Sequence, residues 1–234
     1  MMLRRAAMEA VAVAATVTGI VTAMSMFLPE KYIATAVGFV FLGATWLFVW
    51  RRDDGIVEAA GLALGGIVLP GKVDLPRLAR SSVTAVGWAL LFGAIFFVPF
   101  FFGWRHYWHA HGTFSFHPKP LDFANDAFGQ IVIIALPEEA FYRGYVQSRL
   151  DQAFPQRLRI LGADVGPSLV VTSVVFALGH LATIHEPTRL AVFFPSLVFG
   201  WLRYRTRGIG AGLTFHALCN VFSEVLGRGY HLYS

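Results

Sequence analysis

The chain has 234 residues, of which 56% are hydrophobic and only 14% are charged. Because soluble domains carry about 25% charged residues, this composition predicts a polytopic membrane protein and excludes an ordinary soluble enzyme. The net charge of +5 arises from basic residues that cluster in a few loops, which is typical of cytoplasmic loops in membrane proteins, so we expect no nucleic-acid partner. The single cysteine, Cys219, excludes an intramolecular disulfide bond and a metal site built from several cysteines.

The apolar runs predict an all-α fold with about seven transmembrane helices and an amphipathic helix on the membrane surface. The first run, 7–28, is too long for a signal peptide and is expected to remain as a span. Residues 55–70 are expected to form a short hairpin or re-entrant piece, and residues 73–82 the surface helix. The expected spans are 7–28, 32–50, 83–104, 121–136, 168–184, the run from the Glu186-Pro187 turn to 204, and 209–226.

The fourth span is expected to continue as a helix beyond Pro137 to about residue 150. Pro137 cannot donate a hydrogen bond to residue 133, so we expect a kink just before the residues that follow it. Residues 105–120 are typical of an aromatic belt at a membrane interface, and residues 151–166 of a basic loop. We expect one integrated membrane domain, with N-terminal spans and a cytoplasmic surface segment (51–81) in residues 1–120 and a helical core in residues 121–234.

Lysine and arginine predict the orientation of these spans. If the N-terminus, with Arg4 and Arg5, lies in the cytoplasm, three basic loops fall on the same side: 51–81, 143–166 and 203–207. The opposite loops, which are 29–31, 105–120 and 185–189, are poor in basic residues. The positive-inside rule therefore favours a cytoplasmic N-terminus.

The fourth span leads into Leu136-Pro137-Glu138-Glu139-Ala140-Phe141-Tyr142-Arg143. A charged group costs roughly 2.5–3.5 kcal/mol at the bilayer centre on insertion scales, so a chain keeps such residues for a site or a buried ion pair. Glu139 and Arg143 are four residues apart and share a helix face, where they can pair. Glu138 is rotated by about 100° from Glu139, so we interpret Glu138 as available for chemistry and Glu139 as structural.

Three further polar residues lie in apolar spans, and these are His180, His216 and Asn220. His216 and Asn220 are four residues apart, so one helix face presents both. With Glu138 they provide what hydrolysis of an amide bond needs. A carboxylate can deprotonate water, and a histidine can share or relay that proton. Histidine and asparagine can donate hydrogen bonds to the developing oxyanion, worth roughly 3–4 kcal/mol per donor.

Three motifs now stand on separate spans: Glu-Glu-x-x-x-Arg at 138–143, Phe-x-x-x-His at 176–180 and His-x-x-x-Asn at 216–220. Together they resemble the CAAX prenyl endopeptidase and bacteriocin-processing (CPBP) family of intramembrane proteases. The resemblance extends over about residues 121–226. It implies a multi-helix membrane fold with a cavity open to the cytoplasmic side. It also implies two partners, the lipid bilayer and a membrane-anchored protein or peptide substrate.

The resemblance implies a glutamic-type mechanism with four catalytic side chains, which are Glu138, His180, His216 and Asn220. Glu138 is then the base that activates water and His180 is its partner. His216 and Asn220 stabilise the oxyanion, and the supporting residues are Glu139 and Arg143. The segments 189–203 and 215–220 resemble a bacterial branch that includes the myxosortases. This implies a protein of the bacterial cytoplasmic membrane whose substrates include C-terminal sorting signals.

Glu138, His180 and His216 also form a His/His/Glu set that could bind zinc, as in soluble metalloproteases. The sequence contains no His-Glu-x-x-His helix motif, and Glu138 itself can supply the base. We therefore expect no cofactor, with a zinc-dependent protease of the same architecture as the alternative.

Other polar residues have simpler interpretations. The histidines of the 105–120 segment, His106, His109 and His111, are expected to anchor the interface rather than bind a metal. Asp126 is expected near the outer surface or in a polar pocket, and Cys219 in the packing between helices.

The sequence thus predicts an intramembrane endopeptidase that hydrolyses a peptide bond near the transmembrane segment of its substrate. A non-catalytic scaffold or chaperone could use the same polar cluster to bind transmembrane segments. A transporter could use the glutamate and histidine residues as a proton relay, although the inverted repeats that would favour a transporter are not found.

Overall fold

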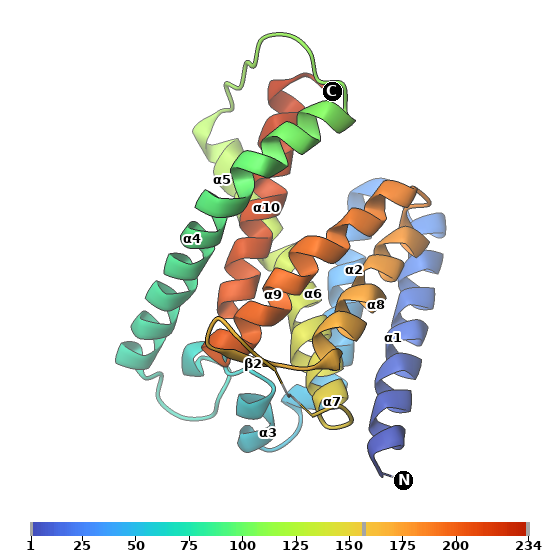
Figure 1. Cartoon of the computed structure of the whole chain (residues 1–234), viewed down its shortest axis with the longest axis vertical. Helices are drawn as coiled ribbons and strands as arrows, with labels where there is room; N and C mark the ends of the chain where they lie inside the picture. Colours follow the sequence, from blue (N-terminus) through green and yellow to red (C-terminus); the bar gives the residue numbers. More distant parts are fainter. Residues whose placement is uncertain (1, 156–157, 233–234) are drawn as a thin grey trace.

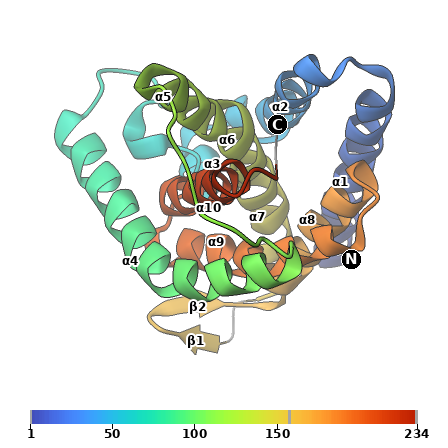
Figure 2. The same ribbon diagram turned by 90° about the horizontal axis from the view of Figure 1, so that it is seen from above.

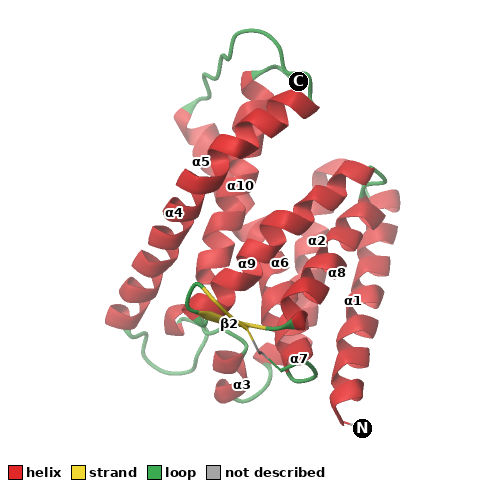
Figure 3. Cartoon of the chain, in the orientation of Figure 1, coloured by secondary structure: helices red, strands yellow, loops and turns green. Residues whose placement is uncertain are grey.

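The computed structural model describes residues 2–155 and 158–232. This part of the chain is almost entirely helical, with one short β-hairpin (Figure 3). The first half contains α1 (Met2–Phe27), α2 (Glu30–Thr45), the π-helical turn η1 (Trp46–Trp50), the short helices α3 (Asp54–Ala59) and η2 (Leu64–Gly66), and the long α4 (Leu75–Tyr107).

The second half begins with one continuous helix, residues 120–151, in which α-helical and π-helical stretches alternate. These are α5 (Pro120–Gly129), η3 (Gln130–Ala135), α6 (Leu136–Glu139), η4 (Ala140–Gln147) and α7 (Ser148–Asp151). The antiparallel hairpin β1 (Leu158–Ile160) and β2 (Ala163–Val165) follows, and then α8 (Pro167–Thr183), η5 (Pro187–Val192), α9 (Phe193–Thr206) and α10 (Gly210–Gly229).

Three helices of the described chain are long and apolar enough to cross a membrane, and these are Arg4–Phe27, Glu30–Trp50 and Leu75–Tyr107. Pro167–Thr183 is a shorter apolar helix. The predicted all-α membrane fold is confirmed, while the count of seven spans stays a prediction. Helix α9 shows why composition alone does not settle the count: it has 14 residues and carries Arg203 and Arg205 in its last turn.

The long helices run between two ends of the bundle (Figure 1). One end holds the N-terminus, α3 and the β-hairpin, and we call it the hairpin end. The opposite end holds the 108–119 loop, the α1–α2 turn and the C-terminus, and we call it the loop end. Seen from above, α10 lies between α4, α9 and the 120–151 helix, with α1 and α2 to one side (Figure 2). The loops predicted on one side of the membrane therefore gather at one end.

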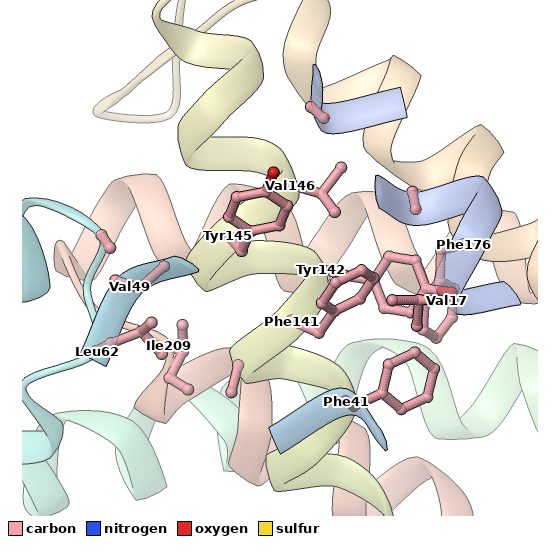
Figure 4. Packing of buried hydrophobic residues seen from close by; sticks show 14 of the residues in the cluster. Val17, Phe41, Val49, Leu62, Phe141, Tyr142, Tyr145, Val146, Phe176 and Ile209 are labelled. Atoms are coloured by element: carbon pink, nitrogen blue, oxygen red, sulfur yellow. The ribbon is translucent and has the colours of Figure 1, made fainter. Parts of the chain in front are cut away.

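The core around the 120–151 helix is aromatic. Phe41, Phe141, Tyr142 and Phe176 meet on one side of this helix (Figure 4), and the ring centroids of Tyr142 and Phe176 are 4.9 Å apart in an edge-to-face arrangement. Such pairs add about 0.5–1.5 kcal/mol beyond the burial of their area. The aromatic core therefore fixes α2 and α8 against the helix that carries the Glu-Glu pair.

Leu62 and Gly144 bring the α3–η2 segment against the other side of the same helix. Leu62 is fully buried, and a Cβ placed on Gly144 would lie 2.6 Å from the Leu62 side chain. Only glycine leaves room for this contact. The piece that the sequence suggested as a short hairpin or re-entrant segment is thus two short helices packed onto the bundle.

A polar network ties the hairpin ends of three helices together. Asp151 accepts hydrogen bonds from the Arg203 guanidinium (3.0 Å) and the Tyr204 hydroxyl (2.6 Å), and the Ser168 hydroxyl also contacts it. Arg203 is buried apart from a small fraction of its surface. Because a partly buried carboxylate with several donors is held in one geometry, this network fixes α7, α8 and α9 relative to each other.

Two local predictions are wrong. Residues 73–82 are not a separate surface helix, since α4 is continuous over 33 residues. Its start is capped by Asp74, whose side chain accepts a hydrogen bond from the Arg77 amide at 3.0 Å. At 1.5 Å per residue α4 is about 50 Å long, longer than the ~30 Å hydrocarbon layer, so its charged first turns can project beyond it.

The basic loop predicted at 151–166 contains a β-hairpin. Leu161 and Gly162 form its turn with positive φ angles of 48° and 83°, the backbone that two-residue hairpins prefer. The exposed Arg159 lies on β1, while Arg157 lies outside the described residues.

Pro137 lies where η3 gives way to α6, and the flanking residues Ala135 and Ala140 keep helical dihedral angles. The proline is therefore accommodated beside π-helical turns rather than ending the helix.

Candidate active site

The Glu-Glu pair lies on the α6 stretch, between two π-helical segments. Such segments occur frequently at functional sites because they redirect side chains from the regular helical spacing. The two carboxylates have different surroundings. The side chain of Glu139 is fully buried, whereas 13% of the Glu138 side chain remains exposed. The structure thus places Glu139 in the interior and Glu138 at a partly exposed position, while the roles assigned to them stay predictions.

Two histidines from different helices converge on one oxygen of Glu138. His216 Nε2 lies 3.7 Å from Glu138 Oε2, and His180 Nε2 lies 4.0 Å from the same atom. Within the described chain this buried oxygen has no hydrogen-bond partner. These separations exceed a direct hydrogen bond and suit a bridging water molecule. The structure thus brings together three of the four predicted catalytic residues.

The second nitrogen of each imidazole is held in place. His180 Nδ1 lies 3.0 Å from the carbonyl oxygen of Phe176, and His216 Nδ1 lies 3.0 Å from Glu139 Oε1. Because a carbonyl and a carboxylate only accept hydrogen bonds, both Nδ1 atoms donate. In their neutral forms both rings therefore present an unprotonated Nε2 toward Glu138. His216 can donate from Nε2 only as an imidazolium.

Glu139 and Arg143 form the predicted pair, with 3.0 Å between Glu139 Oε1 and Arg143 Nη1 and almost no exposure on either side chain. Arg143 also donates to the hydroxyl of Ser196 (2.7 Å) and to its carbonyl oxygen (3.1 Å). Its guanidinium lies over the rings of Phe176 (4.6 Å) and Phe199 (5.2 Å). Arg143 therefore links the 120–151 helix to α8 and α9. It also holds Glu139 in place, and Glu139 in turn orients the ring of His216.

Asn220 lies one helical turn after His216 on α10 and is half-buried. In the described chain it makes no side-chain hydrogen bond, and no contact places it against Glu138. Residues four apart on a helix share a face, so the position of Asn220 agrees with the prediction, while its role stays a prediction.

A cavity of about 560 Å³ opens beside Glu138 and His180. Its walls come from α1, α2, the 120–151 helix and α8. Polar groups among the wall residues include Thr18, Ser25, Glu30, Glu138, Tyr142, His180 and Thr183. A pocket of this size with a few polar groups in apolar walls is typical of ligand sites.

The walls of the cavity extend to the loop end of the bundle. Glu30 is the first residue of α2, Ser25 lies near the end of α1, and Ile184 directly follows α8. No wall residue belongs to α3 or the β-hairpin. Helix α1 runs from one end of the bundle to the other (Figure 1), so these wall residues and the N-terminus lie at opposite ends. The expected opening toward the cytoplasmic side stays a prediction.

The zinc alternative stays a prediction. Among residues 2–155 and 158–232, no three histidine, cysteine, aspartate or glutamate side chains form a group that could hold a metal ion. Asp126 pairs with Arg228 at 2.8 Å. The histidines of the 105–120 segment are exposed, and Cys219 is half-buried.

Sequence reasoning missed two parts of this site. Ser196, which receives two hydrogen bonds from Arg143, has no distinguishing motif. The cavity walls from α1 and α2 come from apolar runs with no polar pattern beyond isolated residues such as Thr18. Both features arise from packing between helices that are far apart in the sequence, and no local sequence pattern reveals such packing.

Residues 120–222 match the family model described as Type II CAAX prenyl endopeptidase Rce1-like. The matched region contains the three motifs and ends just after Asn220. Searches of curated proteins and of solved structures found no match.

Proposed function

Residues 120–222 of the chain belong to the Rce1-like family of CAAX prenyl endopeptidases, and from this premise we propose that the protein is an intramembrane endopeptidase in which Glu138 activates water. The family implies a protease. The observation that supports the glutamate mechanism is the convergence of His180 and His216 on the unpartnered oxygen of Glu138. The site would cut a peptide bond near the transmembrane segment of a membrane protein, including C-terminal sorting signals.

In the first step a water molecule bridges Glu138 and His180, donating one hydrogen bond to the Glu138 carboxylate and the other to Nε2 of His180. Glu138 takes a proton from the water as its oxygen attacks the carbonyl carbon of the substrate. The electron pair of the C=O bond moves to the carbonyl oxygen and forms an oxyanion. The site is partly shielded from solvent, so these electrostatic interactions are stronger than in water.

In the second step the oxyanion collapses, the C–N bond breaks, and the proton held by Glu138 passes to the leaving amine. The Asn220 amide is the neutral donor proposed for the oxyanion. His216 joins it only as an imidazolium, because its Nδ1 hydrogen is already donated to Glu139. Fixed donors of this kind contribute about 3–4 kcal/mol each to transition-state stabilisation.

We place the protein in the bacterial cytoplasmic membrane with its N-terminus in the cytoplasm. Basic residues are concentrated at the hairpin end, which fits a cytoplasmic location for that end. The lipid bilayer and a membrane-anchored protein or peptide are then its partners, and placement in the myxosortase-like branch stays a prediction.

The proposed function predicts that cells whose only copy carries Glu138→Gln accumulate one or more membrane proteins at higher mass. The variant binds substrate but cannot activate water, so uncut precursor builds up. Mass spectrometry of the membrane proteome measures this, with Glu58→Gln as the control, because Glu58 forms an exposed pair with Arg77 at the hairpin end. A scaffold would retain its effect in the Glu138→Gln strain, and an unchanged proteome would contradict the proposal.

A second prediction concerns metal ions. Because Glu138 supplies the base, cleavage by the purified protein is expected to stay within about twofold of its initial rate in excess strong chelator, a change of less than 0.5 kcal/mol in the barrier. The substrate in this assay is the membrane fraction of the Glu138→Gln strain. Loss of cleavage on chelation, followed by recovery with zinc, would replace the glutamate mechanism by the zinc alternative.

A further inference from the structure

The catalytic cavity approaches only one end of the bundle. Along α8, His180 lies three residues before the last helical residue, which is about 5 Å at 1.5 Å per residue. On α2 the walls continue from Phe41 to Glu30, the first residue of the helix. Glu30 is exposed, and so are Ile184 and His185 next to the other rim. The cavity therefore connects Glu138 to the loop end over a short distance.

The basic residues are concentrated at the opposite end. At the hairpin end, where the N-terminus, α3 and the hairpin lie (Figure 1), the described basic residues are Arg4, Arg5, Arg51, Arg52, Lys72, Arg77, Arg80, Arg149, Arg159, Arg203, Arg205 and Arg207. At the loop end they are Lys31, Arg105, Lys119, Arg189 and Arg228. Membrane proteins place lysine and arginine in cytoplasmic loops, so this asymmetry assigns the hairpin end to the cytoplasm.

The cavity reaches the loop end, and the basic residues assign the opposite, hairpin end to the cytoplasm. We infer that the catalytic cavity opens on the non-cytoplasmic side of the membrane. Its substrates are then membrane proteins cut close to the outer end of a transmembrane segment. The inference rests on the proposed function for the cutting step, but the direction of the opening depends only on the cavity walls and the basic residues.

The dimensions of the cavity indicate the form in which a substrate enters. The 5 Å between His180 and the end of α8 corresponds to about two residues of extended chain at ~3.3 Å each. A regular helix hides its peptide bonds in internal hydrogen bonds, so the segment must be extended where it reaches Glu138. The hydroxyl groups of Thr18, Ser25 and Thr183 line the route. Ser25 and Thr183 donate their hydrogens to carbonyl oxygens of their own helices, so they can accept hydrogen bonds from such a backbone.

Site-directed labelling tests the direction of the opening without requiring cleavage. Three single-cysteine variants are made in a Cys219→Ala background: Glu30→Cys at the rim, Ala34→Cys on the cavity wall, and Arg159→Cys on the exposed strand at the hairpin end. The probe is a sulfonated maleimide, applied to right-side-out and to inverted membrane vesicles that contain the full chain. A permeant maleimide measures the total labelling of each cysteine. If Cys219→Ala folds poorly, the same variants are compared with the labelling of the wild-type chain.

In right-side-out vesicles, labelling of Glu30→Cys and Ala34→Cys is expected to exceed that of Arg159→Cys by at least about tenfold, because a charged reagent does not cross the hydrocarbon layer readily. Inverted vesicles should reverse the ratio. The opposite pattern, with the cavity cysteines labelled only in inverted vesicles, would overturn the inference. It would leave the proposed protease activity intact, since that activity stands or falls with the Glu138→Gln strain.

Discussion

Replacing Glu138 by glutamine is expected to lower the rate of peptide cleavage by a factor of about 10²–10⁴, the range that a positioned general base contributes. Glutamine keeps the shape and the hydrogen-bonding oxygen of the side chain but cannot take a proton from water. The Glu138 side chain faces the cavity and forms no ion pair with arginine or lysine in the described chain, so the fold should persist. Initial rates of the purified variant on membranes of the Glu138→Gln strain measure the effect.

The matched control for this variant is Glu58→Gln, which removes an exposed carboxylate paired with Arg77 at 2.9 Å. Surface pairs of this kind are worth about 0–1 kcal/mol, so its cleavage rate and melting temperature should match those of the wild type. If Glu138→Gln and Glu58→Gln cleave at similar rates, Glu138 is not the base. If Glu138→Gln also fails to fold, Glu138→Asp, which keeps the charge at a shifted position, provides the comparison.

The sequence predicted the helices well because apolar runs bounded by charged turns have few alternatives in a bilayer. It failed where exposure and local turns decide the structure. Residues 73–82 mix apolar and charged residues, as an amphipathic surface helix does. The same pattern fits the start of a long helix that projects beyond the membrane, and no residue breaks α4 at Val83. The β-hairpin depends on positive φ angles at Leu161 and Gly162, and leucine is a rare choice for such a position.

In the candidate site, the parts governed by helical spacing could be predicted. The Glu139–Arg143 pair and the separate direction of Glu138 follow from the geometry of one helix. Contacts between helices could not be predicted in this way. Ser196 meets Arg143 across 53 positions of sequence, and α1 and α2 supply cavity walls although they lie outside the three motifs. The direction of the opening depends on which helix ends these walls reach, which the pattern of apolar residues does not encode.

The largest effect on stability is expected at Arg143. Its guanidinium is fully buried among Glu139, Ser196 and the rings of Phe176 and Phe199. Arg143→Ala removes the charge and leaves the Glu139 carboxylate buried without its partner, which typically costs 3–5 kcal/mol. At about 2–4 °C per kcal/mol for a chain of this size, the melting temperature should fall by roughly 6–20 °C. Thermal unfolding of the purified variant in detergent measures this.

A matched control distinguishes the effect of leaving a buried charge unpaired from the effect of removing any arginine. Arg159 also pairs with a carboxylate, Asp164, but at 4.0 Å and with most of both side chains exposed, so Arg159→Ala should change stability by at most about 1 kcal/mol. Replacing both members of the buried pair, as in Glu139→Gln with Arg143→Met, should recover part of the stability lost in Arg143→Ala, because no unpaired charge remains. Cleavage should recover less than stability, because glutamine can still accept a hydrogen bond from Nδ1 of His216 but no longer carries the negative charge that favours the His216 imidazolium. Equal melting temperatures for Arg143→Ala and Arg159→Ala would show that the buried pair does not hold the three helices together.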